Sequence, residues 1–200
     1  MALKHSYTLL APIYDSLVSG PLDAVRARSL ERLHDVKNKK ILINGIGSGL
    51  DLPHLPNDGE YIATDITPAM LKRAIKRAEL LSLNIDFQIA DSQNLPFSDN
   101  HFDIIVMHLI LAVVPDSEKA LSEACRVLKP GGKIFIFDKF IHRGQLAPVR
   151  RFINLFLRHI ATRTNVIFED TLQSCDKLIL IKDEPALAAG WFRLIELEKP

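Results

Sequence analysis

Short apolar runs rich in β-branched residues alternate along this chain with segments of helical periodicity. Strands are predicted at five places in its central part: Lys40–Asn44, Tyr61–Thr64, Ile85–Ile89, Phe102–Met107 and Lys133–Phe137. Helical segments are predicted between them: a short one at Leu50–Leu55, then Pro68–Leu81 and Ser117–Leu128, the last capped by Asp116 or Ser117. Lys129–Gly132 is predicted to end this last helix before the fifth strand. The fourth strand is apolar at nearly every position, as in a strand buried on both faces. Strands that alternate with helices indicate parallel βαβ units.

Both ends of the chain extend this pattern. Residues 1–36 precede the first strand, and we expect them to form a helix at Asp23–Val36 and a lid over a bound substrate. At the other end, a helix at Gln145–Thr162 is followed by strands at Lys177–Lys182 and Trp191–Glu198, which are separated by Pro185 and Gly190. These two strands are close enough in sequence to pair antiparallel. The predicted fold is therefore α/β: an open, mostly parallel seven-stranded sheet with an antiparallel last strand and helices on both faces.

Composition adds limits to this picture. The 200 residues are 48% hydrophobic and 24% charged, which suits a single globular domain. The net charge of +1 gives no reason to expect a nucleic-acid partner. The two cysteines are isolated, so no zinc spacing is present and no metal site is predicted. The N-terminus lacks the pattern of a signal peptide, and the apolar stretch Ile104–Val114 is too short to span a bilayer. We predict a cytoplasmic protein.

The strongest local signal is a glycine loop directly after the first strand. Gly45, Gly47 and Gly49, with Ser48 between the last two, lack the side chains that would keep a ligand away from the backbone. Backbone N–H groups in such a loop can bind a ligand. The alternatives are a tight turn without a ligand and a dinucleotide site, because this motif alone is weakly specific.

Two acidic residues follow at the ends of the next strands. Asp65 ends the second strand, where a carboxylate can accept hydrogen bonds from both hydroxyls of a ribose. Asp91 follows the third strand and can accept a hydrogen bond from an adenine amino group. The alternatives are helix capping for Asp65 and an exposed turn for Asp91. Because parallel strands end at one edge of a sheet, the sequence predicts a nucleoside site there.

Five motifs in succession resemble those of class I S-adenosylmethionine-dependent methyltransferases, which have a Rossmann-like fold. They are Ile41–Gly49, Ala63–Leu71, Ala90-Asp91 with Leu95-Pro96-Phe97, Phe102-Asp103 and Arg126–Gly132. The resemblance implies that residues 40–138 bind S-adenosylmethionine, with the glycine loop at the methionine portion, Asp65 at the ribose and Asp91 at the adenine. It also implies that four further residues lie in the cofactor site: Ile66, Met70, Ser92 and His108. The family usually carries an acid at the position of Ile43, and Asn44 follows it here.

A narrower resemblance concerns the methyl acceptor. Three segments are similar to bacterial phosphatidylethanolamine N-methyltransferases: Leu10–Asp15, Gly45–Pro56 and Pro185–Leu197. The Tyr14-Asp15 pair is shared with quinone C-methyltransferases. The resemblance therefore implies a phospholipid headgroup or similar phosphate-bearing amine as acceptor, with a small apolar metabolite such as a quinone as the alternative. A cofactor-binding regulatory protein without catalysis is a third alternative, because Ile43 departs from the family pattern.

Residues 139–200 begin with a strongly basic stretch. Residues 139–163 contain six Lys or Arg residues and two His residues but no acidic residue. Apolar residues within this stretch recur at helical spacing, which is typical of an amphipathic helix at an anionic membrane surface. The protein would then be peripheral at the inner membrane surface. The alternative is a helix that packs its apolar stripe on the sheet and leaves its arginines solvated.

Candidate residues for the methyl transfer are identified by their positions along the sequence. Tyr14 is a candidate catalytic residue near the acceptor, and His108 follows the fourth strand, where it can relay a proton. The alternatives are a buried tyrosine and a structural histidine. Candidate acceptor-binding residues are Tyr7 and Tyr14 from the N-terminal segment, and Lys139, His142 and Arg143, which follow the fifth strand and can bind a phosphate.

Overall fold

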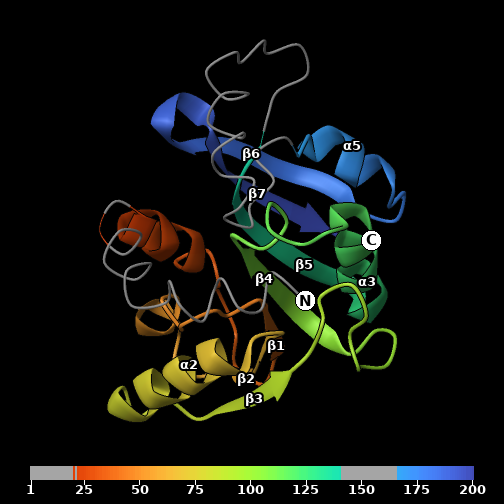
Figure 1. Ribbon diagram of the computed structural model, residues 1–200. Helices are drawn as coiled ribbons and strands as arrows, with labels where there is room; N and C mark the ends of the chain where they lie inside the picture. The colour runs from red at the N-terminus through yellow and green to blue at the C-terminus, as the bar shows by residue number, and fades with distance from the viewer. Residues whose placement is uncertain (1–19, 21, 141–165) are drawn as a thin grey trace.

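The computed structural model describes residues 20, 22–140 and 166–200. They form a seven-stranded sheet in the order β3-β2-β1-β4-β5-β7-β6 (Figure 1). The strands are β1 (Lys40–Asn44), β2 (Glu60–Asp65), β3 (Ile85–Ile89), β4 (Phe102–His108), β5 (Leu128–Lys139), β6 (Ile179–Leu187) and β7 (Phe192–Glu198). The predicted α/β fold and its seven strands are confirmed.

Strand directions follow the prediction. Strands β1 to β5 pair in parallel, and β7 is antiparallel to both of its neighbours, β5 and β6. The carboxyl ends of β1, β2 and β4 therefore meet at one edge of the sheet. This edge is where the glycine loop, Asp65 and His108 follow their strands.

The helices cover both faces of the sheet. They are α2 (Pro68–Leu80), α3 (Ser117–Val127), α5 (Phe168–Gln173), a helix described over residues 22–30, and the short 3-10 turns η1 (Leu52–His54) and η2 (Ala188–Gly190). Pro68 occupies the first turn of α2, where its missing N–H costs no hydrogen bond. Asp116 caps α3 by accepting a hydrogen bond from the backbone N–H of Lys119 at 3.0 Å, as one of the two predicted caps.

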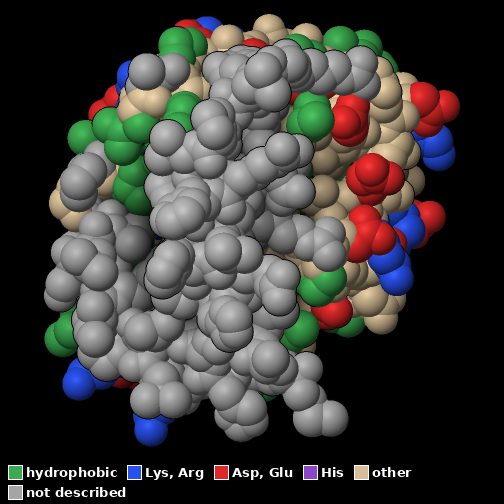
Figure 2. Space-filling view, turned by 45° about the horizontal axis from the view of Figure 1, so that its top comes forward, with side chains coloured by type: hydrophobic (Ala, Val, Ile, Leu, Met, Phe, Trp, Pro, Cys, Tyr) green, Lys and Arg blue, Asp and Glu red, His purple; other side chains and the backbone are tan. Residues whose placement is uncertain are grey.

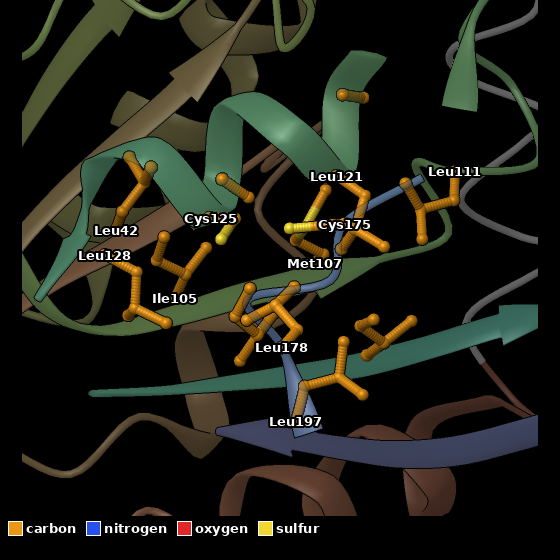
Figure 3. Packing of buried hydrophobic residues seen from close by; sticks show 14 of the residues in the cluster. Leu42, Ile105, Met107, Leu111, Leu121, Cys125, Leu128, Cys175, Leu178 and Leu197 are labelled. Atoms are coloured by element: carbon orange, nitrogen blue, oxygen red, sulfur yellow. The ribbon is translucent and has the colours of Figure 1, made fainter. Parts of the chain in front are cut away.

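Alternating side chains of the central strands divide the core between the two faces. Leu42 and Ile105 point to the side of α3, where Leu121 and Cys125 pack against them (Figure 3). Ile43 points to the other side and belongs to a second cluster with residues of α2 and of the segment 30–36. Because both faces are buried, the central strands are apolar at consecutive positions.

Three predicted boundaries were wrong. Lys129–Gly132 does not separate α3 from β5; the strand begins at Leu128, and Gly131 adopts a φ of +76° within it. Pro185 lies inside β6 instead of between the last two strands, because β6 is an edge strand and a register shift accompanies the proline. The helix predicted to reach Val36 ends at residue 30, and Asp35 has a left-handed φ of +56° that a helix does not allow.

The predicted helix at Gln145–Thr162 lies outside the described residues. Among the helices of residues 20, 22–140 and 166–200, none is long and apolar enough to cross a bilayer. On the face shown in Figure 2, described acidic and basic side chains lie beside one another, in keeping with the near-neutral net charge.

A buried arginine joins the last strands to α5. The Arg193 guanidinium on β7 donates from Nη2 to Glu169 Oε1 at 2.9 Å and from Nε to Asp183 Oδ1 at 3.0 Å. Its central carbon also lies 5.8 Å from the ring centre of Phe140 and 5.3 Å from that of Phe168. One cation therefore holds two strands and a helix together at this side of the sheet.

We predict that Arg193→Met lowers the free energy of unfolding by about 3 kcal/mol, because it leaves two carboxylates without their buried partner. The matched control is Lys133→Met, which breaks a pair with Glu196 in which the lysine side chain is 41% exposed. That change should cost no more than about 1 kcal/mol. Urea denaturation of both variants measures the difference, and equal losses would contradict the role given to Arg193.

Candidate functional site

A cavity of about 430 Å³ lies at the carboxyl edge of the sheet. Its wall is formed by the glycine loop, the ends of β2, β3 and β4, the segment after β4, and Arg26 from the N-terminal helix. Nine of the ten predicted cofactor residues line this cavity: Gly45, Gly47, Ser48, Asp65, Ile66, Met70, Asp91, Ser92 and His108. The tenth, Gly49, is not among the lining residues. The topology therefore brings together residues that the sequence places on four separate strand ends.

The three glycines of the loop have different reasons to be glycine. All three have positive φ, at +81° for Gly45, +58° for Gly47 and +82° for Gly49. A Cβ on Gly45 would lie 2.7 Å from Ile110 Cδ1, and one on Gly49 would lie 3.0 Å from the backbone Cα of Ala74. A Cβ on Gly47 would meet no atom within 4 Å, although Gly47 lines the cavity. The space that a side chain at Gly47 would fill is therefore open for a ligand.

Asp65 connects the glycine loop to the start of α2. Its Oδ2 accepts a hydrogen bond from Gly47 N at 2.9 Å, and its Oδ1 accepts one from Thr67 N at 2.8 Å. Burial raises the pKa of the Asp65 carboxyl, while these backbone donors act in the opposite direction. Helix capping and ligand binding thus do not exclude each other, since each carboxylate oxygen can accept more than one hydrogen bond.

The end of β3 supplies the next part of the wall. Asp91 Oδ1 accepts hydrogen bonds from the backbone N of Gln93 at 2.9 Å and from its Nε2 at 3.0 Å. These bonds fix the turn after β3 and place Asp91 at the cavity. Ile66, from the end of β2, is 42% exposed although it lines the same cavity. An exposed apolar side chain beside a carboxylate is suited to packing against a flat base.

The position of the usual family acid is part of the core. Ile43 is buried among the residues on the α2 side of the sheet. The Asn44 side chain instead accepts through Oδ1 from Ser92 Oγ at 2.7 Å and Thr64 Oγ1 at 3.4 Å. Neither Ile43 nor Asn44 lines the cavity. We call the open space beside the Gly47 backbone the cradle; it lies next to the Asp65 carboxylate. The cradle and this carboxylate fit the amino-acid and nucleoside parts of S-adenosylmethionine.

His108 reaches the cavity at the end of β4, but both of its ring nitrogens are engaged. Its Nδ1 lies 2.8 Å from Asp51 Oδ1 and its Nε2 lies 2.9 Å from Ser29 Oγ. The side chain is fully buried, and its ring meets the edge of Phe137 at 5.6 Å between centres. This geometry matches the alternative of a hydrogen-bonded structural histidine, and the proton relay stays a prediction.

Sequence reasoning missed two residues that line the cavity and a third that anchors a segment of its wall. Arg26 and Asp51 form an ion pair of 2.6 Å in its wall, and neither position follows a strand. Asp138, at the carboxyl end of β5, is fully buried and accepts from Ala112 N at 3.0 Å and from Lys139 N at 2.7 Å. It thereby anchors the segment after β4. A carboxylate at a strand end is a sequence signal that could have identified Asp138.

The structure does not place the remaining predicted site residues in the cavity. Lys139 ends β5, and it is not among the residues that line the cavity. Tyr7, Tyr14, His142 and Arg143 lie outside the described residues, so their roles stay predictions. The same holds for most of the basic stretch 139–163.

Comparison with known proteins gives a consistent result. Residues 42–136 match the methyltransferase domain family. The chain is 26% identical over 201 residues to a phosphatidylethanolamine N-methyltransferase of Cereibacter sphaeroides, covering 99% of this chain and 98% of that protein. It is 32% identical over 143 residues to a ubiquinone/menaquinone biosynthesis C-methyltransferase of Pseudomonas savastanoi. That match covers 67% of this chain but only 55% of the relative.

Solved structures share the architecture. The crystal structure of the [4+2]-cyclase SpnF superposes with a TM-score of 0.80 at 18% identity, covering 98% of this chain and 95% of that one. At this identity the likeness establishes the fold and nothing about the reaction.

We predict that Gly47→Ala and Gly49→Ala have opposite profiles. Gly47→Ala should cost about 1 kcal/mol of stability for its positive φ, yet weaken S-adenosylhomocysteine binding at least about ten-fold by filling the cradle. Gly49→Ala should cost more than about 2 kcal/mol, because its Cβ meets backbone. Urea denaturation and calorimetric titration measure the two effects, and identical profiles would refute this division of roles.

A second prediction concerns the pH dependence of stability. Burial raises the pKa of Asp138 to about 6 from an ordinary value of 3.8. Between these values the folded protein holds a proton that the unfolded chain releases, so this residue lowers stability as pH rises, by roughly 3 kcal/mol in all. Asp138→Asn cannot ionise. Its stability relative to wild type should therefore increase from pH 4 to pH 7 in urea titrations; a constant difference would contradict the assignment.

Proposed function

Since this chain is an S-adenosylmethionine-dependent methyltransferase of class I, we propose that its acceptor is the amine of a phospholipid headgroup or a similar phosphate-bearing amine. The observation that carries this proposal is the similarity to a phosphatidylethanolamine N-methyltransferase along almost the whole of both chains. That match includes nearly all of residues 1–39 and 139–200, which lie outside the cofactor-binding core.

The residues of the chain have separate tasks in this reaction. S-adenosylmethionine supplies a methyl group already activated on a sulfonium, so the protein acts mainly by positioning. The glycine loop and Asp65 hold and orient the cofactor from one side of the cavity. Leu109, Ile110 and Val113 give the segment after β4 an apolar wall, which keeps water from the methyl group. An amine must lose its proton before it attacks, and Tyr14 and His108 are the predicted candidates for guiding it.

The basic stretch supports a lipid acceptor. Near an anionic bilayer, each cation of residues 139–163 contributes on the order of 1 kcal/mol to surface binding. A headgroup amine lies in the same interface and would reach the cavity from there. We propose a peripheral position at the inner membrane surface for this reason.

A second acceptor class has support of its own. The quinone-biosynthesis C-methyltransferase has the higher sequence identity of the two relatives, at 32%. The match covers only 55% of that protein. The apolar wall after β4 suits a quinone ring as well as a lipid. The test must therefore include both.

We predict that methyl-labelled S-adenosylmethionine transfers label to phosphatidylethanolamine in vesicles, and faster when the vesicles also contain anionic lipid. Parallel reactions hold a quinone precursor or total soluble metabolites in place of the lipid. Asp65→Ala is the control, because loss of the ribose acceptor should abolish transfer to every substrate. Label in the quinone and none in the lipid would replace the proposed acceptor by the alternative one.

A further inference from the structure

The wall of the cavity contains a buried ion pair whose role the cofactor residues do not explain. Arg26 is 5% exposed and Asp51 is 2% exposed, and Arg26 Nη1 lies 2.6 Å from Asp51 Oδ1. Arg26 comes from the helix over residues 22–30, and Asp51 comes two residues after the glycine loop. Both line the cavity. The pair therefore faces the same space as the cradle at Gly47.

Stability alone is a weak reason for this pair. Taking two charges out of water carries a penalty that their mutual attraction repays poorly, and apolar residues of similar size commonly replace such pairs without loss. A buried pair that borders a cavity gains more if a ligand completes its hydrogen bonds. Its location thus points to binding.

The hydrogen bonds already made leave one nitrogen of Arg26 without a partner among the described residues. Arg26 uses Nη1 for Asp51, whereas its Nε is buried and has no partner among the described residues. With Nη2, Nε forms the edge through which a guanidinium holds an oxyanion by two parallel hydrogen bonds. On Asp51, the bonds from Arg26 and from His108 both end on Oδ1.

The carboxylate is held in its charged form. Burial by itself would raise the pKa of Asp51, but the charges and hydrogen bonds of His108 and Arg26 hold it well below its ordinary value. An ionised carboxylate can only accept, so His108 donates from Nδ1 to Asp51, and its Nε2 lies 2.9 Å from Ser29 Oγ. This chain of bonds fixes the orientation of Asp51.

We propose that Arg26 and Asp51 form a subsite for a zwitterionic group, with an oxyanion of the ligand against the Arg26 guanidinium and an ammonium group against the Asp51 carboxylate. The charges of the pair cancel, so a group with no net charge matches them best. A lone phosphate would meet the Asp51 carboxylate as well, and a lone amine would meet the Arg26 cation.

Two groups of this chemistry take part in the reaction. One is the amino-acid end of S-adenosylmethionine, with its ammonium and carboxylate. The other is the headgroup of the proposed acceptor, with its amine and phosphate, and only this source rests on the proposed function. The experiment separates them by using ligands that differ in the zwitterion alone.

The first measurement is calorimetric binding of S-adenosylhomocysteine and of 5′-methylthioadenosine, which keeps the nucleoside and lacks the amino-acid end. Arg26→Lys retains the charge next to Asp51 but loses the two-donor edge. If the cofactor is the source, this variant weakens S-adenosylhomocysteine binding about ten-fold and 5′-methylthioadenosine binding less than about two-fold. The matched control is Arg32→Lys, whose guanidinium pairs with Glu184 away from the cavity.

The second measurement is the KM for glycerophosphoethanolamine, a soluble zwitterionic headgroup. If the headgroup is the source, Arg26→Lys raises this KM about ten-fold while the binding of both nucleosides stays unchanged. Unchanged values for all three ligands overturn the subsite. Equal losses for S-adenosylhomocysteine and 5′-methylthioadenosine overturn it too, because the effect would then be on the fold. A wild-type protein that does not methylate any amine refutes the proposed acceptor but leaves the cofactor measurement intact.

Discussion

The hydrogen bond from Gly47 N to Asp65 Oδ2 fixes the geometry on which the whole site depends. It adds to two backbone bonds of 2.9 Å from Gly45 and Ile46 to the carbonyl of Thr64. Together they hold the glycine loop against the end of the neighbouring strand. Since β1 and β2 run in parallel register, their ends are adjacent, and the loop has one position relative to the carboxylate. Every other wall of the cavity is arranged around this junction.

Two carboxylates, Asp51 and Asp65, line the cavity, and a third, Asp138, anchors a segment of its wall; their environments differ. Asp65 and Asp138 accept backbone N–H groups and carry no cationic partner in the described structure, so burial raises the pKa of both. Asp51 contacts Arg26 and His108, and its pKa falls well below the ordinary value. The pKa of an aspartate is therefore raised or lowered here according to the groups that surround it. Asp138 anchors backbone N–H groups, whereas Asp51 pairs with a buried cation.

The helix over residues 22–30 is integrated with the cavity through the same group of contacts. Arg26 binds Asp51, two residues after the glycine loop, and Ser29 binds His108 at the end of β4. A helix that precedes the sheet thereby joins two of its strand ends. His108 contributes to this connection with both ring nitrogens, which accounts for its complete burial. His108, which was predicted as a proton relay, connects β4 to the helix over residues 22–30 and to the segment after the glycine loop in this structure.

The sequence by itself determined most of the strands and helices and brought most of the predicted cofactor residues to one cavity, because each signal is local. Period-two and helical patterns report burial of a single element, and Lys40–Asn44 and Ile85–Ile89 were predicted with their observed bounds. Parallel βαβ order then brings the glycine loop, Asp65 and Asp91 to one edge without further information. Errors arose where packing overrides local preference, as for Pro185 on an edge strand.

Only the tertiary structure decided which charges become partners. Arg26 and Asp51 are 25 residues apart, and Ser29 and His108 are 79 apart. No spacing rule connects such positions, because their contact depends on how a helix packs against the ends of two strands. The effect of burial is equally non-local: Asp138 and Asp103 are both acids of strands, yet Asp138 is completely buried, while Asp103 is partly exposed and paired with Lys129. The sequence locates the site, and the packing of the chain sets its electrostatics.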